Sequence, residues 1–369
     1  MRIVADSAIP HLESSLKSVL SEQEFSLSYF KNSEFSTLNQ NDIDILLIRS
    51  PTKINEATLK SNSIKFIGSA TSGMDHIDTK FLERQGIQWA HAPGCNAWSV
   101  VHYVMSALEI IYTQGLATIS NGIGIVGYGN IGTKLESVLK ALSIPYTIYD
   151  PIVLPSSTKS LEDVFIHDVV SLHVPLTKTG EFPTYHMIDS KELQQLEFKT
   201  LINTSRGGVI NESVLDDFTS INLIADVWEK EPSIERKFFE QALVYTPHIA
   251  GYSLDGKYNG TQTITEALAE FLGKPIADEV VNLPERTFGE EDFLGFQEQC
   301  HSCSFPVGLF SAELDLIKLM DLFKKDAEAG LNLSSIRTKH PPRRDFVHYS
   351  LLGEKLEDLE ILSKLMQID

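Results

Sequence analysis

Cysteine is scarce in this sequence: only Cys95, Cys300 and Cys303 occur among 369 residues. Three cysteines cannot form the disulfide framework of a small secreted domain, which favours a cytoplasmic protein. Cys300 and Cys303 make a single CxxC motif without a second pair nearby, so we expect two ordinary thiols rather than a zinc site. No metal ion is therefore expected.

The sequence also lacks long apolar runs and has fewer basic than acidic residues. No stretch reaches about 18 consecutive apolar residues, the length typical of a membrane-spanning helix, and the first residues lack the pattern of a signal peptide. Lys and Arg number 31 against 50 Asp and Glu, for a formal charge of −19. This balance argues against a nucleic-acid partner, whose phosphates require a basic surface, whereas a small anion needs only a local cluster of cations.

Strand and helix patterns alternate along the N-terminal part of the chain. The expected strands in about the first 90 residues are Arg2–Ala5, Ile43–Arg49, Ile64–Ala70 and Ile87–Ala90. Helical patterns between them lie near Pro10–Leu20, Asn55–Leu59 and Asp78–Gln85. This alternation predicts parallel strands in a βαβ arrangement.

A second series of strands follows a helix expected at Trp98–Thr113. Its strands are expected at Ile123–Gly127, Tyr146–Tyr149, Val169–Val174, Thr200–Asn203, Leu223–Val227 and Leu243–Thr246. Six strands are enough for a complete dinucleotide-binding sheet of the Rossmann type. A further helix at Ser253–Leu272, ended by Gly273, is expected to return the chain to the first domain.

These patterns predict an α/β protein of several domains. We expect residues 1–94 and 253–284 to form one domain, residues 95–252 a Rossmann-type doubly wound parallel sheet, and residues 285–369 a small C-terminal α+β domain. The C-terminal domain carries amphipathic stretches at Ala312–Lys325 and Leu352–Met366. Such stretches usually form core, and a partner-facing side is a further interpretation.

The strongest local motif is Gly127-Tyr128-Gly129-Asn130-Ile131-Gly132, which follows an apolar strand and opens a helix. In a nucleotide-binding turn of this kind, the first glycine permits the tight turn and the second lets the backbone approach a pyrophosphate. The third glycine lets the helix pack on the strand. The alternative is a glycine-rich turn without a ligand.

Asp150 closes the strand after this motif, and Pro151 follows it. A carboxylate at this position accepts hydrogen bonds from ribose hydroxyls and repels a 2′-phosphate, which favours NAD over NADP. The alternative is an aspartate in a surface loop.

Three polar residues follow the ends of three predicted parallel strands: Arg206, Glu231 and His248. Ligands of open parallel sheets bind beyond these strand ends. Oxidation of an alcohol requires a base near neutral pH, which histidine provides, and a carboxylate can orient the imidazole. A guanidinium can bind a substrate carboxylate with two hydrogen bonds. Singly, the three residues could instead be a surface ion-pair partner, a solvated acid and a histidine after a turn.

Four motifs in this order resemble the D-isomer-specific 2-hydroxyacid dehydrogenases. They are GIVGYGNIG (Gly124–Gly132), INTSRGGVI (Ile202–Ile210), ADVWEKEP (Ala225–Pro232) and TPHIAG (Thr246–Gly251). The resemblance covers roughly residues 40–285. It implies transfer of a hydride between NAD and C2 of a small 2-hydroxy acid.

The resemblance also assigns residues to the site. It implies that Arg206, Glu231 and His248 are the catalytic set, with His248 as the proton donor and acceptor. It implies that the residues at NAD are Gly127, Gly129, Asn130, Ile131, Gly132, Asp150, Val174, Thr204, Ser205, Asp226 and Gly251. It implies that the residues at the substrate are Arg49, Ser50, Thr71 and Tyr252. Thr204 and Ser205 depart from the alanine–cysteine pair of some relatives, and Val174 offers only its backbone where a hydroxyl residue can occur.

Four further segments narrow the resemblance: Leu46–Asn55, Gly68–Asp78, Ala92–Ala97 and His248–Thr261. They are similar to members that oxidise 4-phospho-D-erythronate in a route to vitamin B6 and that dimerise through an additional C-terminal domain. The resemblance implies this phosphorylated substrate, a flavodoxin-like substrate-binding first domain, and a homodimer. For the phosphate we nominate Arg49, Ser50 and Lys53, with Arg343 and Arg344 as further candidates across a dimer, unless they form a solvated basic turn.

Two kinds of alternative stay open from the sequence. The first is the same chemistry on another small acid, such as phosphoglycerate or glycerate. The second is a different class of protein: a non-catalytic NAD-sensing protein on this scaffold, or a methyltransferase. A methyltransferase would leave Arg206, Glu231 and His248 without an explanation.

Overall fold

The computed structural model describes residues 1–154, 160–233, 241–277, 282–288, 296–300, 303–328, 333–340 and 343–351, together with Leu365 and Ile368. Its contacts divide the chain into two compact units. Unit 1 comprises Met1–Asn96 and Ser253–Pro284, and unit 2 comprises Ala97–Tyr252 and Glu285–Asp369. None of the described helices has the length and apolar composition that a membrane span needs.

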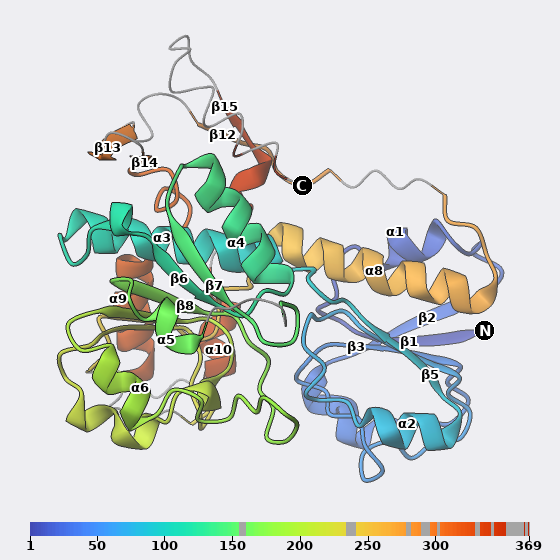
Figure 1. Ribbon diagram of the computed structural model, residues 1–369. Helices are drawn as coiled ribbons and strands as arrows, with labels where there is room; N and C mark the ends of the chain where they lie inside the picture. Colours follow the sequence, from blue (N-terminus) through green and yellow to red (C-terminus); the bar gives the residue numbers. More distant parts are fainter. Residues whose placement is uncertain are drawn as a thin grey trace. The chain divides into compact units, whose positions relative to one another are not determined.

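Unit 1 contains a sheet of five parallel strands (Figure 1). The strands are β1 (Arg2–Asp6), β2 (Ser26–Phe30), β3 (Ile45–Ile48), β4 (Phe66–Ser69) and β5 (Gln88–His91). Their order, β2-β1-β3-β4-β5, is that of flavodoxin, and it confirms the predicted flavodoxin-like domain.

Helices cover both faces of this sheet because successive strand residues point to opposite sides. The helices are α1 (Leu12–Lys17), α2 (Thr79–Gln85) and α8 (Leu254–Leu272). Ile3 and Leu47 pack with α1 and α8, whereas their chain neighbours Val4 and Leu46 pack with α2. Helix α8 begins after the capping residue Ser253 and ends at the left-handed Gly273, as predicted.

Two local features of unit 1 differ from expectation. The helix predicted near Asn55–Leu59 is wrong: the segment forms a turn, because Asn55 Oδ1 accepts hydrogen bonds from the backbone N–H groups of Ala57 and Thr58 (3.0 and 3.1 Å). A side chain that binds its own backbone in this way favours a turn over a helix. The sequence patterns predict no strand at the position of β2, because Phe30 is its only fully buried residue and apolar alternation is therefore weak.

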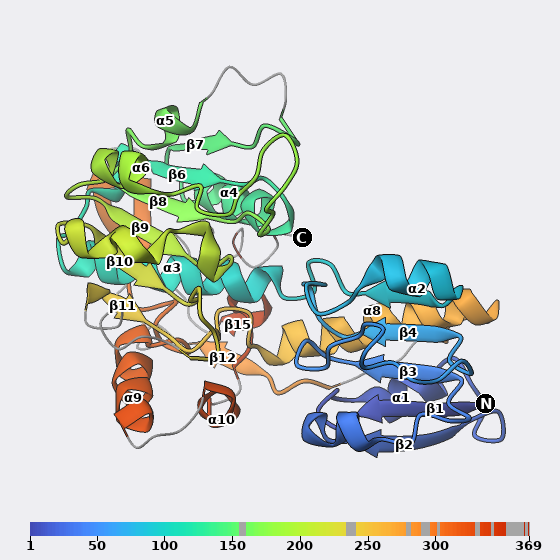
Figure 2. The ribbon, with the colours of Figure 1, turned by 90° about the horizontal axis from the view of Figure 1, so that it is seen from below.

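Unit 2 contains a six-stranded parallel sheet, and all six predicted strands are present. They are β6 (Ile123–Val126), β7 (Tyr146–Tyr149), β8 (Val169–Leu172), β9 (Thr200–Asn203), β10 (Asn222–Ala225) and β11 (Val244–Tyr245). Figure 2 shows them in the order β11-β10-β9-β8-β6-β7. The chain therefore reverses direction across the sheet between β6 and β8, and such switch points are where open α/β sheets bind ligands.

Helices cover both faces of this second sheet as well. They are α3 (Ala97–Thr113), α4 (Asn130–Ala141), α5 (Leu161–Val164) and α6 (Ser190–Gln195). Ile125 faces the core formed by α3 and α4, and its neighbour Val126 faces the core that contains α5 and α6. The doubly wound arrangement predicted for this part of the chain is confirmed.

The C-terminal segment packs onto unit 2. Its described elements are β12 (Arg286–Phe288) paired with β15 (Tyr349–Leu351), β13 (Phe296–Cys300) paired with β14 (Cys303–Pro306), α9 (Leu316–Glu328) and α10 (Leu333–Thr338). Phe310 and Phe346 join the core of α3, whereas Phe323 and Ile336 join the core of the opposite face. The segment thus groups with the Rossmann sheet, although the sequence suggests a third domain.

Two predictions about the C-terminal segment remain as they were. The amphipathic stretch at Leu352–Met366 lies outside the described residues except for the buried Leu365. The role of the segment in dimerisation is untested and stays a prediction.

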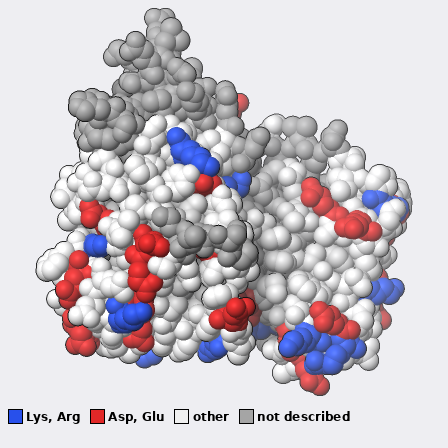
Figure 3. Space-filling view, viewed as in Figure 1, with Lys and Arg blue, Asp and Glu red and all other residues white. Residues whose placement is uncertain are grey.

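On the face that Figure 3 shows, the described Lys and Arg side chains lie among Asp and Glu and form no continuous patch.

The shared core makes a testable prediction about stability. Phe323 is 3% exposed, whereas Leu322 beside it on α9 is 47% exposed. We expect Phe323→Ala to lower the free energy of unfolding by about 3–5 kcal/mol, and Leu322→Ala, the matched control, by less than about 1 kcal/mol. Urea unfolding followed by circular dichroism measures both. Equal, small effects would contradict the placement of α9 in this core.

Candidate active site

The three glycines of the motif between β6 and α4 differ in what a side chain at each position would meet. Gly127 has φ +99°, and a Cβ there would lie 2.4 Å from His173 O. At Gly132 a Cβ would lie 2.2 Å from Gly127 O, so helix α4 can approach the strand only without a side chain. At Gly129 a Cβ would meet nothing within 4 Å, so the backbone presents an open side. This is the geometry expected of a pyrophosphate-binding turn.

The N-terminus of α4 completes this turn. Gly129 is the capping residue and supplies no side chain that could bind the first backbone N–H groups. Asn130 and Ile131 form the first turn of the helix, where N–H groups and the helix dipole favour an anion. The turn therefore fits the phosphates of a dinucleotide.

Asp150 lies beside the glycine turn at the end of β7. Its Oδ2 accepts a hydrogen bond from Tyr128 N (2.8 Å), and its Oδ1 accepts from the N–H groups of Ile152 and Val153 (both 2.9 Å). A carboxylate offers about four acceptor positions, so a ribose hydroxyl can still bind. Val174 packs on the opposite side of the turn, since its Cγ1 lies 3.0 Å from the Cβ position of Gly127.

The turn after β9 carries Thr204, Ser205 and Arg206. Asn203 braces it: Oδ1 accepts from Ser205 N (3.1 Å) and Oγ (2.8 Å), and Nδ2 donates to Arg206 O (3.0 Å). Thr204 is 7% exposed, and among the described residues its Oγ1 has no hydrogen-bond partner. A buried hydroxyl of this kind fits a polar ligand such as the cofactor. The half-buried Arg206 donates from Nη1 to Ser205 O (2.9 Å).

Glu231 and His248 come together from the ends of β10 and β11. His248 Nδ1 lies 2.9 Å from Glu231 Oε2, and the histidine side chain is 38% exposed. Trp228 N donates to the other carboxylate oxygen, Oε1 (3.0 Å). His248 has φ +59°, a left-handed conformation that is uncommon for residues other than glycine.

The charges around Glu231 fix the proton on the imidazole. Burial opposes ionisation of Glu231, but the hydrogen bond and charge of His248 and the charge of Arg337 outweigh it, so the pKa lies below its ordinary value. An ionised carboxylate can only accept, so Nδ1 of His248 must donate. Nε2 of the neutral imidazole is then the acceptor, as a base requires.

Asp226 holds the loop on which His248 lies. The carboxylate is 1% exposed. Its Oδ1 accepts from Thr246 Oγ1 (2.6 Å) and Ile249 N (2.7 Å), and its Oδ2 accepts from Ala250 N (2.7 Å). Burial raises the pKa of Asp226 despite these bonds. Its contact with NAD, and that of the half-buried Gly251, stay predictions.

Two arginines of the C-terminal segment contact this site, and no sequence pattern indicates either contact. Arg337 Nη2 lies 2.7 Å from Glu231 Oε2. Arg343 Nη2 donates to Ala250 O (2.7 Å), and the residue is 2% exposed. The nomination of Arg343 for the substrate phosphate is wrong, because its guanidinium is buried against the backbone. The half-buried Arg344 remains a candidate.

The other predicted substrate residues divide between the two units. Arg49 follows β3 in unit 1 and pairs with the buried Asp6, with Nε 3.3 Å from Oδ2. Ser50 and Lys53 beside it are exposed. Thr71, also in unit 1, shares a hydrogen bond of 2.8 Å between its Oγ1 and Ser69 Oγ. Tyr252, in contrast, ends the Rossmann part of unit 2.

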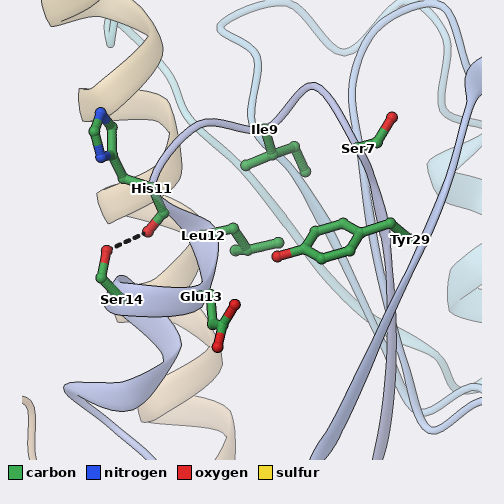
Figure 4. Close-up of a pocket in the computed structure, with 7 residues that line it drawn as sticks. All are labelled: Ser7, Ile9, His11, Leu12, Glu13, Ser14 and Tyr29. Atoms are coloured by element: carbon green, nitrogen blue, oxygen red, sulfur yellow. Dashed lines mark hydrogen bonds between the residues drawn. The ribbon is translucent and has the colours of Figure 1, made fainter.

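A cavity of about 350 Å³ in unit 1 contains none of the predicted site residues. Figure 4 shows its lining: Ser7, Ile9, His11, Leu12, Glu13, Ser14 and Tyr29. Ser14 Oγ donates to His11 O (2.9 Å), and the Tyr29 ring extends toward Leu12. In the described part of the chain, no group of three or more His, Cys, Asp or Glu residues is placed to hold a metal ion.

Comparison with known proteins agrees with this geometry. Residues 112–250 match the D-isomer specific 2-hydroxyacid dehydrogenase, NAD binding domain. The chain is 32% identical over 373 residues to a protein of Teredinibacter turnerae named erythronate-4-phosphate dehydrogenase, covering 96% of each chain. It is 41% identical over 269 residues to the protein of that name from Wigglesworthia glossinidia brevipalpis, covering 68% of this chain and 71% of the relative.

A solved structure has the same fold. It is the NAD⁺-bound 3-phosphoglycerate dehydrogenase of Entamoeba histolytica, with a TM-score of 0.62 and 20% sequence identity. The match covers 74% of this chain and 95% of that one.

The position of Asp150 predicts the choice of cofactor. Asp150→Asn keeps a side-chain oxygen for the backbone of the glycine turn but removes the charge that repels a 2′-phosphate. We expect the ratio of kcat/KM for NAD to that for NADP to fall at least about tenfold, roughly 1.4 kcal/mol in discrimination. Initial rates with each cofactor measure this ratio. An unchanged ratio would mean that Asp150 does not face the ribose.

Proposed function

The chain belongs to the D-isomer-specific 2-hydroxyacid dehydrogenase family of NAD-dependent oxidoreductases, and from this premise we propose that it oxidises 4-phospho-D-erythronate at C2. The product is 2-oxo-3-hydroxy-4-phosphobutanoate, formed with NADH and a proton in a route to pyridoxal 5′-phosphate. The observation that carries the proposal is the 2.9 Å contact between His248 Nδ1 and Glu231 Oε2. The choice of substrate is based on the relatives named erythronate-4-phosphate dehydrogenase.

The residues of this chain supply the acid–base chemistry. NAD, held at the glycine turn and Asp150, supplies the acceptor for the hydride that leaves C2. His248 Nε2 takes the proton of the C2 hydroxyl as the carbonyl forms. Glu231 stabilises the imidazolium that results and keeps the ring in the orientation for transfer. In the reverse direction the same imidazolium returns the proton.

The substrate carries two anionic groups and therefore requires two cationic contacts. Arg206 binds the carboxylate and polarises the developing carbonyl oxygen, since a guanidinium offers parallel hydrogen bonds to such a group. Arg49, with Ser50 and Lys53, binds the phosphate. The buried Asp6 supports this assignment because it fixes the Arg49 guanidinium at the end of β3. Thr71 and Tyr252 complete the substrate contacts.

A second candidate is the same reaction on phosphoglycerate or glycerate. The fold likeness to 3-phosphoglycerate dehydrogenase does not favour it, since members of the family with different substrates share this fold. NADH absorbance with 4-phospho-D-erythronate, 3-phosphoglycerate and glycerate separates the two. We expect the highest kcat/KM for 4-phospho-D-erythronate, and a higher value for either other acid would reject the proposal.

We also propose that the protein is a homodimer that works in the cytoplasm. The C-terminal segment resembles the dimerisation domain of similar enzymes, and the low cysteine content agrees with a reducing compartment. Light scattering of the purified protein measures the oligomer. A monomer at micromolar concentration would contradict the first part.

The proposed base makes the next prediction. We expect His248→Ala to lower kcat by about 10²–10⁴, because the variant lacks the group that takes the hydroxyl proton. Glu231→Gln keeps the shape of the side chain but loses its charge, so kcat should fall by a smaller factor. NADH absorbance under saturating substrate gives both values. A kcat near that of the wild type in His248→Ala would remove the imidazole from the mechanism.

The assignment of Arg49 to the phosphate has its own test. Arg49→Ala should raise KM for 4-phospho-D-erythronate about tenfold or more, which is ~1.4 kcal/mol, while KM for D-erythronate changes little. Because Asp6 would lose its partner, circular dichroism must show that the variant is folded. Arg49→Lys, which keeps the charge, should lie between the wild type and Arg49→Ala. Equal effects on both acids would discard the assignment.

A further inference from the structure

Two arginines hold the backbone on either side of His248. Arg337 Nε donates to Pro247 O (2.6 Å), directly before the histidine. Arg343 donates to Ala250 O (2.7 Å), two residues after it. All of these residues belong to unit 2, and both arginines come from the C-terminal segment. The segment therefore contacts the loop of the base within its own chain.

The loop needs such support because of its conformation. His248 has φ +59°, and left-handed residues other than glycine persist only where the surroundings determine the backbone. Asp226 binds the N–H groups of Ile249 and Ala250, and the arginines bind carbonyl groups of the same loop. The loop is thus fixed through donors and acceptors from both sides.

Arg337 also reaches the carboxylate that orients the imidazole. Its Nη2 lies 2.7 Å from Glu231 Oε2, the same oxygen that accepts from His248 Nδ1 at 2.9 Å. The side chains of Arg337 and Glu231 are 23% and 20% exposed, so their interaction is less screened than at an open surface. One carboxylate oxygen therefore accepts from two donors, the Arg337 guanidinium and Nδ1 of His248.

We propose that Arg337 is a positioning residue that sets the orientation and charge environment of His248 through Glu231. The C-terminal segment thereby completes the active site of its own chain, in addition to any role in dimerisation. This inference rests on the proposed function of the His248–Glu231 pair. Arg337 itself is not required to touch the substrate or the cofactor.

The charge of Arg337 has a definite direction of effect. A guanidinium on Glu231 satisfies part of the carboxylate charge and so reduces its attraction for a proton on the imidazole. It also repels the protonated ring directly. Among the described residues, Glu231 and Asp226 interact electrostatically with His248, and Arg337 opposes their negative charge. Removal of the Arg337 charge would therefore leave the negative charge beside His248 less opposed.

The first part of the test reads the imidazole without requiring turnover. Diethyl pyrocarbonate modifies neutral imidazole, and mass spectrometry of the peptide that contains residue 248 gives the rate at each pH. We expect the pH midpoint of this reaction to rise by about half a unit to one unit in Arg337→Met, because a cation on the partner carboxylate is lost. Arg337→Lys keeps the charge and should stay closer to the wild type.

Lys339→Met is the matched control. Lys339 lies two residues further along the same segment and pairs with Asp326 (3.0 Å), so its substitution removes an equal charge without touching Glu231. We expect its pH midpoint to match that of the wild type and its kcat to stay within about twofold of the wild-type value. In Arg337→Met we expect kcat to fall about ten- to a hundredfold with the KM for NAD nearly unchanged, and Arg337→Lys to recover part of the loss.

The outcomes separate this inference from the proposed function. An unchanged midpoint in Arg337→Met, or the same shift in Lys339→Met, overturns the positioning role whatever the activity. A wild-type protein that forms no NADH from any 2-hydroxy acid rejects the proposed function, while the modification rates still decide the effect of Arg337. If circular dichroism shows that Arg337→Met is unfolded, Arg337→Gln decides, because it removes the charge and keeps a hydrogen-bond donor: an unchanged midpoint overturns the inference, and a raised midpoint supports it.

Discussion

The hydrogen bond between His248 Nδ1 and Glu231 Oε2 is the contact on which the proposed chemistry depends. His248 lies in a left-handed turn, with φ +59°. The buried carboxylate of Asp226, at the end of β10, accepts from three groups of that turn and holds it. A buried carboxylate without such donors would be strongly unfavourable, so the turn and Asp226 stabilise each other. β10 pairs with β11, so Asp226 and the turn at His248 follow neighbouring strands.

At the nucleotide turn, steric exclusion determines the backbone geometry, as hydrogen bonding does around His248. Gly127 and Gly132 leave no room for a Cβ, whereas Gly129 leaves its side of the backbone open. The first two bring helix and strand together, and the third leaves space for phosphates. Cofactor and base then depend on one sheet, since the turn follows β6 and His248 follows β11.

Much of the fold could be predicted because buried parallel strands are short apolar runs, and all six strands of unit 2 were found in this way. Strand β2 could not, since only Phe30 is fully buried, and the turn at Asn55 depends on a side-chain hydrogen bond that apolar spacing does not reveal. The pair of Glu231 and His248 followed from strand ends and chemistry. The contact of Arg337 with Glu231 spans 106 positions, and no local pattern indicates it. The burial of Arg343 was likewise invisible, because a basic pair in sequence normally indicates an exposed turn.

The most direct test is the tautomer of His248, because base function requires the proton on Nδ1 and the acceptor at Nε2. Nuclear magnetic resonance of protein labelled with ¹⁵N-histidine distinguishes the two nitrogens of each imidazole, and His248→Gln identifies the signals. We predict that the neutral ring carries its proton on Nδ1, bonded to Glu231, and that Glu231→Gln disturbs this signal. A neutral ring protonated on Nε2, unaffected by substitution of Glu231, would contradict it.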